Sequence, residues 1–325
     1  MLINAIINSP KQFEFDPEIG NAEKLPKAEK FIVAGMGGSH LAADLLKILK
    51  PELDLTVHCD YGLPPMSEND LRSSLIIASS YSGNTEETID ALNTVLKRAL
   101  QGAAVSLNGE LLKMARENNL PYIKLPDTDI QPRSAVGFSI VALLKLMGEE
   151  ASLKELKKLS KTLDVEDTQE RGKELAKTLK GYVPVIYSSR RNQPLAYNWK
   201  IRFNETAKVP AFVNVFPELN HNEMMGFDVV DATRPLSEKF HFVILQDPSD
   251  HPRIKLRMQV LAEVYGGLDL PVTVIELQGR SVWEKIFSSI LVADWTAYYS
   301  GLEYETDIEG EESVEGFKKR LKELS

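Results

Sequence analysis

A single cysteine, Cys59, occurs among the 325 residues, so the chain can form no intramolecular disulfide and offers no cysteine cluster for zinc. No apolar run reaches the length of about 20 residues that a membrane-spanning helix needs. The N-terminus lacks the basic region that begins a signal peptide. These absences predict a cytoplasmic protein without a membrane anchor.

Positive charge is also in deficit, because 38 Lys and Arg stand against 47 Asp and Glu, a net charge of −9. This excess of negative charge argues against nucleic acid or an anionic membrane as a partner. It does not exclude a small anionic substrate, which needs only a local group of donors. The length exceeds the size at which a single hydrophobic core stops growing, so we expect two domains.

Short apolar runs alternate with helical patterns through the first half of the chain. The runs predicted to be strands are residues 31–34, 55–58, 75–79, 103–107 and 121–125. Alternation of this kind predicts a parallel sheet with helices on both faces. Ligands of such sheets bind beyond the carboxyl ends of the strands.

Residues 149–180 are rich in Lys, Glu and Leu and predict two helices, 153–163 and 168–179, that link the halves. The alternation then resumes. Strands are predicted at 183–187, 211–215, 241–245 and 272–277, and helices at 193–208, 253–265 and 283–300. A short helix is predicted at the C-terminus. The predicted domains are 1–152 and 153–325, the second including the linker and the C-terminal helix.

Residues 75–88 join a buried strand to a helix through a loop rich in hydroxyl groups. The apolar run at its start is typical of a strand covered on both faces. Asn84, with Glu87 three residues later, has the spacing of a capping box. The helix is therefore predicted to begin here.

This junction is a candidate phosphate site. Amides at a helix start lack carbonyl partners and carry partial positive charge. Together with the hydroxyl groups of Ser80, Ser82 and Thr85, they can hold a phosphate without a lysine. An ordinary capped loop is the alternative, since Ser and Thr are common at helix starts.

A glycine-rich turn, Gly-Met-Gly-Gly-Ser at residues 35–39, follows the first predicted strand. It matches part of the dinucleotide fingerprint G-x-G-x-x-G, but His40 stands where the last glycine should be. A dinucleotide site therefore stays only an alternative. We expect Gly38 to allow close approach of the backbone to a ligand and Ser39 to donate to that ligand.

Two segments of the second half carry polar candidates. Glu205 lies late in the predicted helix 193–208, where partial burial would raise its pKa and suit it as a general base; a solvated surface glutamate is the alternative. The run Glu-Leu-Asn-His-Asn-Glu at 218–223 is polar between large apolar residues. Its one histidine, His221, does not make a zinc motif. His241, by contrast, is expected at a surface or loop position.

Four segments together resemble the archaeal-type bifunctional phosphoglucose/phosphomannose isomerases of the phosphoglucose isomerase superfamily. They are residues 35–39, 80–88, 204–208 and 217–223. The serine-rich loop is common to the superfamily, whereas the run at 217–223 is more specific. The resemblance covers nearly the whole chain. It implies two doubly wound parallel-sheet α/β sugar-isomerase domains plus a C-terminal helix, a phosphorylated hexose as substrate, and no cofactor or metal.

The same resemblance implies a substrate-binding set. Ser80, Ser82 and Thr85 would hold the sugar phosphate, and Gly38 and Ser39 would support the sugar. Mannose 6-phosphate acceptance goes with a threonine just before the C-terminal helix in this family. No threonine stands at 311–313 here.

A catalytic set is implied as well. Arg133, in a Pro-Arg pair, would stabilise the intermediate, and Glu205 would be the base. His221 would open the sugar ring and come from the neighbouring subunit, which implies a homodimer. Lys318 in the C-terminal helix completes the set, with Lys319 adjacent.

These residue types suit aldose–ketose isomerisation on chemical grounds. Ring opening needs proton transfer at the ring oxygen, for which histidine is suited. One carboxylate can then carry a proton from C2 to C1 through a cis-enediolate, while an arginine stabilises the oxyanion. The predicted reaction interconverts glucose 6-phosphate and fructose 6-phosphate, with mannose 6-phosphate as a further candidate substrate. A non-catalytic sugar-phosphate-binding regulatory protein of the same fold is the alternative, although it would have no need of Glu205, His221 and Lys318 together.

Overall fold

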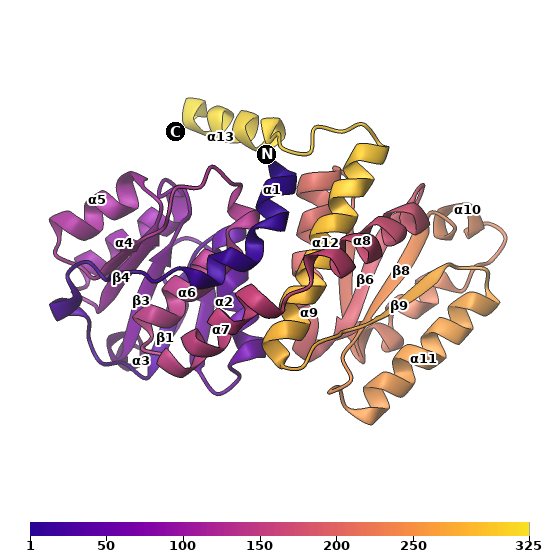
Figure 1. Ribbon diagram of the computed structural model, residues 1–325, viewed down its shortest axis with the longest axis horizontal. Helices are drawn as coiled ribbons and strands as arrows, with labels where there is room; N and C mark the ends of the chain where they lie inside the picture. Colours follow the sequence, from indigo (N-terminus) through magenta and orange to yellow (C-terminus); the bar gives the residue numbers. More distant parts are fainter. Residues whose placement is uncertain (325) are drawn as a thin grey trace. The chain divides into compact units, whose positions relative to one another are not determined.

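The computed structural model describes residues 1–324, and the chain divides into two compact units (Figure 1). The N-terminal unit contains Asn4–Leu163 and Ser281–Glu284. The C-terminal unit contains Met1–Ile3, Asp164–Arg280 and the chain from Lys285 onward. Each unit has its own parallel sheet and its own hydrophobic core, which confirms the predicted α/β class.

Five parallel strands form the sheet of the N-terminal unit, in the order β2-β1-β3-β4-β5. They are β1 (Lys30–Ala34), β2 (Asp54–His58), β3 (Ser74–Ser79), β4 (Gly102–Ser106) and β5 (Tyr122–Lys124). The helices are α2 (Gly38–Leu49), α3 (Glu68–Ser73), α4 (Glu86–Lys97), α5 (Gly109–Glu117), α6 (Val136–Leu146) and α7 (Glu150–Thr162). The strand order reverses between β1 and β3, so the ligand crevice of this sheet lies at their carboxyl ends.

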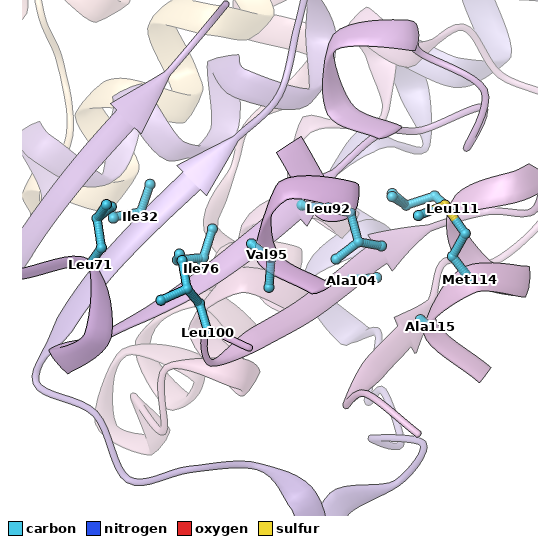
Figure 2. Packing of buried hydrophobic residues seen from close by; sticks show 11 residues of the cluster. Ile32, Leu71, Ile76, Leu92, Val95, Leu100, Ala104, Leu111, Met114 and Ala115 are labelled. Atoms are coloured by element: carbon cyan, nitrogen blue, oxygen red, sulfur yellow. The ribbon is translucent and has the colours of Figure 1, made fainter. Parts of the chain in front are cut away.

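Strand β3 is buried at every residue, as its continuous apolar run predicts. On one face Ile76 belongs to a cluster with Ile32 of β1 and with Leu92 and Val95 of α4 (Figure 2). Burial of each such side chain stabilises the fold by about 1.5–3 kcal/mol. The polar loop after β3 therefore starts from a firmly packed strand.

Four parallel strands form the sheet of the C-terminal unit, in the order β7-β6-β8-β9. They are β6 (Val183–Ser189), β7 (Phe212–Phe216), β8 (Phe240–Gln246) and β9 (Val272–Glu276). The helices are α8 (Val165–Leu179), α9 (Gln193–Arg202), α10 (Arg234–Ser237), α11 (Pro252–Gly267), α12 (Val282–Glu303) and α13 (Glu312–Leu324). This order repeats that of the first four strands of the other unit, so β6 corresponds to β1 and β8 to β3.

Several helices were not predicted individually, α5 and α6 among them, and the shortest of these are α1 (Leu2–Ile7), α3 and α10. Each of these three has six residues or fewer, which is too short for an apolar period to show. His241 was also wrongly expected near the surface, because it is 3% exposed within β8. In the described part of the chain, no helix combines the length and the apolar character needed to cross a bilayer.

Candidate active site

The loop after β3, residues 80–85, is held in shape by its own hydroxyl groups. Ser80 is buried, and its Oγ lies 2.8 Å from Thr85 Oγ1 and accepts a hydrogen bond from Gly83 N–H at 3.1 Å. Thr85 is the N-cap residue of α4, so the first-turn amides of that helix open at the same place. Ser82 is exposed to solvent. The structure thus brings Ser80, Thr85 and a helix N-terminus together.

The segment after β4 supports this loop. Leu111 N–H donates to Gly83 O at 2.9 Å, and Leu107 N–H donates to Tyr81 O at 3.0 Å. Gly83 has φ +75°, and a Cβ there would fall 1.7 Å from Asn108 O, so only glycine fits. The loop is therefore preorganised by its contacts with the segment after β4.

The predicted capping box at Asn84 is wrong. Helix α4 begins at Glu86, and its N-cap residue Thr85 makes no side-chain capping bond. Asn84 Oδ1 instead accepts a hydrogen bond from Glu110 N–H at 3.1 Å, in the first turn of α5. The spacing of Asn84 and Glu87 fits a cap of α4, but the Asn84 side chain binds an amide of α5 instead.

The glycine turn after β1 packs against the loop after β3. Ser39 is buried, and its Oγ accepts a hydrogen bond from Tyr81 N–H at 2.9 Å. The Ser39 hydroxyl proton can still be donated elsewhere. At Gly35 a Cβ would fall 2.7 Å from Ser79 O, so the ends of β1 and β3 approach closely. Ser39 therefore positions the loop after β3.

Arg133 lies in a short 3-10 turn, Pro132–Ser134, directly before α6, and is 2% exposed. This turn packs on the glycine turn: a Cβ on Gly38 would lie 2.8 Å from Pro132 O and 3.0 Å from Arg133 N. Gln12 fixes the segment further, because its Nε2 donates to Ser134 O at 2.7 Å. The N-terminal unit thus assembles most of its predicted set around the ends of β1 and β3. The members are Gly38, Ser39, Ser80, Thr85 and Arg133.

Glu205 lies in a π-helical turn, Phe203–Ala207, that continues α9. Such turns are rare and frequently occur at functional sites. Glu205 is partly buried, and Lys208 Nζ donates to its backbone carbonyl at 2.8 Å. Lys208 ends the helix with φ 57°. The helix predicted over 193–208 therefore changes its winding at the turn that carries the candidate base.

The loop between α12 and α13 packs on the Glu205 turn. Thr306 Oγ1 lies 3.4 Å from Ala207 O and 3.3 Å from Gly301 O. A Cβ on Gly301 would lie 3.2 Å from both Thr206 O and Thr306 Oγ1. Thr306, upstream of residues 311–313, is thus placed beside the turn that carries Glu205.

His221 ends a 3-10 turn, Glu218–His221, that follows β7. The polar side chains next to His221 hydrogen-bond to each other and to Tyr187 of β6. Asn222 Nδ2 donates to Glu218 Oε1 at 2.9 Å, and Tyr187 OH donates to Glu223 Oε1 at 2.5 Å. His221 is exposed, and its ring makes no hydrogen bond with any described residue. The internal bonds of its neighbours leave His221 as the side chain of this run that is available for chemistry.

Lys318 projects from α13 with 57% of its side chain exposed, and its Nζ pairs with Glu315 Oε1 at 2.7 Å. Lys319 is exposed as well. The apolar side chains that predicted this helix, Val314 and Phe317 among them, are also exposed. The helix is confirmed, and the choice of Lys318 over Lys319 stays a prediction.

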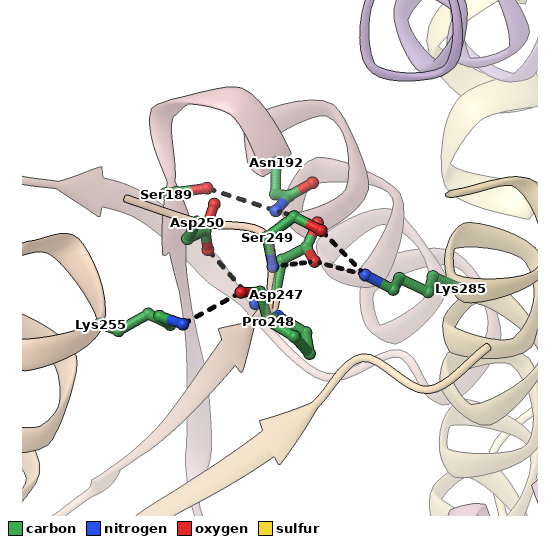
Figure 3. A network of polar contacts seen from close by, with 8 residues as sticks. All are labelled: Ser189, Asn192, Asp247, Pro248, Ser249, Asp250, Lys255 and Lys285. Atoms are coloured by element: carbon green, nitrogen blue, oxygen red, sulfur yellow. Dashed lines mark hydrogen bonds and ion pairs between the residues drawn. The ribbon is translucent and has the colours of Figure 1, made fainter. Parts of the chain in front are cut away.

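A further polar network, not foreseen from the sequence, lies at the end of β8 (Figure 3). Asp247 is 1% exposed, and its Oδ1 accepts hydrogen bonds from Lys285 Nζ at 3.0 Å and Ser249 N–H at 2.9 Å. Asp250 Oδ2 accepts one from Asp247 N–H at 3.2 Å. The only signal in the sequence is a pair of acids after a strand. No three His, Cys, Asp or Glu side chains among the described residues are grouped to hold a metal ion.

The pKa values of the two acids of this network shift in opposite directions. Burial tends to raise the pKa of Asp247, but the Ser249 amide and the Lys285 ammonium outweigh it and hold that pKa below its ordinary value. Burial raises the pKa of Asp250. Asp247 is therefore the ionised partner of Lys285.

In the N-terminal unit, His40 lies next to Ser39 at the start of α2, with its Nδ1 2.8 Å from Asp44 Oδ2. Burial lowers the pKa of His40, but hydrogen bonds to Asp44 and Cys59 outweigh burial and raise it to about 9. The residue that breaks the dinucleotide fingerprint is therefore a charged imidazolium at neutral pH.

Two relatives match this chain along nearly its whole length. The bifunctional phosphoglucose/phosphomannose isomerase of Aquifex aeolicus (strain VF5) is 30% identical over 315 residues, 96% of this chain and 95% of that protein. The protein of the same name from Caldicellulosiruptor bescii is 31% identical over 344 residues, 99% of each. The chain belongs to this family. A family model described as the bacterial phospho-glucose isomerase C-terminal SIS domain also matches residues 168–321 of this phosphoglucose/phosphomannose isomerase family member.

The fold extends to proteins of much lower identity. The crystal structure of glucosamine-6-phosphate deaminase from Thermotoga maritima has a TM-score of 0.69 at 14% identity and covers 95% of each chain. Such a likeness shows the fold alone. The family itself, which the sequence motifs had indicated, is confirmed by the full-length relatives.

Proposed function

We propose that this protein interconverts glucose 6-phosphate and fructose 6-phosphate and that it also accepts mannose 6-phosphate. The main support is the preorganised loop 80–85 at the start of α4, in a chain whose full-length relatives carry both activities in their names. A phosphate needs several donors and a favourable potential, and a helix N-terminus flanked by hydroxyl groups offers both.

The phosphate binds to the Ser80 and Thr85 hydroxyl groups and to the first-turn amides of α4. Ser82 adds a hydroxyl from the exposed side of the same loop, and Gly38 and Ser39 support the sugar. Because the phosphate is remote from the reacting carbons, its binding energy positions C1 and C2 without changing their chemistry.

The chemistry needs two proton-transfer steps. His221, with Lys318, moves protons at the ring oxygen and the anomeric hydroxyl as the ring opens. Glu205 then takes the proton from C2 and returns it to C1, and Arg133 stabilises the negative charge of the enediolate oxygen. Each step uses side chains of this protein, and we propose no cofactor or metal.

The proposed assembly is a cytoplasmic homodimer in which His221 serves the site of the neighbouring subunit. The exposed position of His221 at the end of its turn supports this part of the proposal. An exposed histidine can reach a substrate on another chain, whereas a histidine packed inside its own unit could not.

The test is Glu205→Gln, assayed with glucose 6-phosphate and with mannose 6-phosphate in the presence of a chelator. Loss of the base that acts at C2 should lower kcat by about 1,000-fold, within the usual contribution of general base catalysis. Fructose 6-phosphate binding, measured by calorimetry, should stay within about threefold.

Glu238→Gln is the matched control, because Glu238 is an exposed glutamate of the same unit, and it should keep full activity. Glu205→Gln protein that still turns over both substrates would remove Glu205 from the mechanism. Protein of wild-type sequence that binds fructose 6-phosphate but isomerises neither aldose would contradict the proposed function.

A further inference from the structure

The polar run at 218–223 ends in Glu223, which has no part in the proposed proton transfers. Its side chain is partly buried, and each of its two oxygens binds a different strand. Tyr187 OH of β6 donates to Oε1 at 2.5 Å, and Asn214 Nδ2 of β7 donates to Oε2. Asn214 Oδ1 accepts a hydrogen bond from Val215 N–H at 2.8 Å, so Nδ2 is the atom that faces the carboxylate. Glu223 thus ties the loop after β7 back to the sheet.

The two donors are held in place by the sheet itself. Tyr187 and Asn214 are direct partners in the parallel pairing of β6 with β7, so both side chains leave the sheet on the same face. Tyr187 is fully buried, and its ring packs edge-to-face on Phe216. Burial raises the pKa of Tyr187, and the nearby Tyr265 and the Glu223 carboxylate raise it further, so its hydroxyl stays a donor at physiological pH. Glu223 is therefore bound to two groups that are themselves fixed.

His221 lies midway between two anchored positions of the loop. Leu219, two residues before it, is 0% exposed and belongs to the hydrophobic cluster of the C-terminal unit. Glu223, two residues after it, is held by the two strands. Anchors on both sides restrict the positions that the His221 imidazole can take. A catalytic group on a loop is preorganised by supporting bonds of this kind.

The other side-chain hydrogen bonds that the structure describes for this loop do not reach the sheet. Asn222 Nδ2 donates to Glu218 Oε1, which joins two residues of the loop to each other. Arg257 Nη1 donates to Asn220 Oδ1 at 3.3 Å, a long bond that leads to α11. Hydrogen bonds to a carboxylate are stronger than those between neutral groups. The bonds of Glu223 are therefore well suited to hold the loop.

We propose that Glu223 is a positioning residue for ring opening: its carboxylate, bound to β6 and β7, holds the loop after β7 in the arrangement that presents His221 to the sugar ring. This inference rests on the proposed function, in which His221 moves protons at the ring oxygen. Loosening the anchor should slow ring opening. It should leave the proton transfer by Glu205 and the phosphate site at residues 80–85 intact.

Exchanging the acid and the amide tests the anchor. Asn214→Asp sets a second carboxylate against Glu223, and repulsion between the two should free the loop from the sheet. We expect kcat with glucose 6-phosphate to fall about 100-fold, the cost of displacing a catalytic group by about 1 Å. Adding Glu223→Gln restores an acid–amide pair with the roles reversed. The double variant should therefore return to within about fivefold of the wild-type kcat.

Exchange between the two anomers of glucose 6-phosphate, followed by NMR, isolates the step that is slowed. This exchange needs ring opening and closure but no proton transfer at C2. Asn214→Asp should lower the catalysed exchange about 100-fold, in parallel with kcat, whereas Glu205→Gln should keep the exchange and lose isomerisation. Fructose 6-phosphate binding to Asn214→Asp, measured by calorimetry, should keep its stoichiometry and stay within about threefold in Kd. A general loss of structure would lower binding and exchange together.

Glu218→Gln is the matched control, because Glu218 is the exposed acid at the other end of the run and binds Asn222 within the loop. It should keep both anomer exchange and isomerisation within about twofold of wild type. Tyr187→Phe is a second test of the anchor. It keeps the buried ring and removes one donor to Glu223, so anomer exchange should fall about tenfold.

Full anomer exchange in folded Asn214→Asp or Tyr187→Phe protein overturns the proposal. So does a folded double variant that stays as slow as Asn214→Asp, or loss of fructose 6-phosphate binding together with exchange. Tyr187→Phe decides the matter if the Asn214→Asp variants fail to fold. A wild-type protein that neither isomerises glucose 6-phosphate nor exchanges its anomers would instead contradict the proposed function, so the two failures are distinguishable.

Discussion

The loops after β3 and β8 occupy equivalent places in the two sheets, yet they treat negative charge in opposite ways. Strand β3 pairs with β1, and β8 pairs with β6, which is the earliest strand of its sheet along the chain, as β1 is. The loop after β3 leads into α4, and the loop after β8 leads into α11. After β3 the chain presents the hydroxyl groups of Ser80 and Thr85. After β8 it presents the buried carboxylate of Asp247, already paired with Lys285. The first position offers hydroxyl groups, as the proposed phosphate site requires, and the second supplies an anion of its own.

The difference follows from what each loop contains. The loop after β3 ends at the N-terminus of α4, which favours negative charge. The N-terminus of α11 is instead capped by His251, whose Nδ1 accepts a hydrogen bond from Arg253 N–H at 3.1 Å. Asp247 satisfies the Ser249 amide and a lysine from within, so the end of β8 is closed as an ion pair. In the proposed function, the phosphate therefore binds at the switch point whose loop, residues 80–85, carries no acid.

The largest effect is expected from Lys285→Met, which leaves Asp247 buried without its cation. Breaking a buried pair in this way destabilises a protein by about 3–5 kcal/mol. The free energy of unfolding, measured with urea at pH 7, should fall by that amount. The deficit should shrink as the pH falls, because the lone carboxyl can then take up a proton.

Lys255→Met is the matched control. Lys255 Nζ binds only Pro248 O in the same network, at 3.0 Å, so its loss should cost less than about 1 kcal/mol. The double variant Asp247→Asn with Lys285→Met should recover most of the loss. If the two lysine variants unfold alike, the ion pair does not hold the loop closed.

A second variant gives the β3 loop the sign of charge found after β8. Thr85→Asp places a carboxylate at the N-cap of α4, a position that aspartate favours, so the melting temperature should not fall. Repulsion of a phosphate by a fixed charge costs several kcal/mol. With about 3 kcal/mol lost, KM for glucose 6-phosphate should rise about 100-fold.

Thr85→Asn is isosteric with the aspartate variant and also a good N-cap, so it separates charge from shape. Its KM should rise by less than about tenfold. Equal effects of Asp and Asn would show that the phosphate does not bind next to Thr85.

The structure of the loop after β3 could be predicted from the sequence, whereas the ion pair after β8 could not. The apolar run before Ser80 predicts β3, and hydroxyl groups before a helical period predict the loop, because both signals are local. The pairing of Asp247 with Lys285 joins residues 38 positions apart, and nothing in either segment indicates the other. Two acids after a strand read as a solvated loop until the fold places a lysine over them.

Local patterns also misled where a tertiary contact took over a side chain. Asn84 has the spacing to cap its own helix but caps α5. The turn of Glu205 lies in a predicted helix, yet its backbone is π-helical, and residues of the α12–α13 loop pack on it. In both places the sequence predicts where the segment lies, and a contact with a distant part of the chain accompanies the departure from the local pattern.

The smallest expected effect is on the pH dependence of stability, which should differ between the two units. His40 has a pKa of about 9, above its ordinary value of 6.5, so its contribution to stability is complete below pH 6.5 and is lost as the pH rises through 9. His241 in β8 has a pKa that burial lowers to about 4, so its neutral form stabilises the fold above pH 6.5 and this contribution is lost as the pH falls through 4. Each swing should be on the order of 3 kcal/mol in the free energy of unfolding. His40→Gln should flatten the alkaline side of the stability profile and His241→Gln the acidic side. If both variants altered the same side, the assignment of a charged histidine to one unit and a neutral histidine to the other would be wrong.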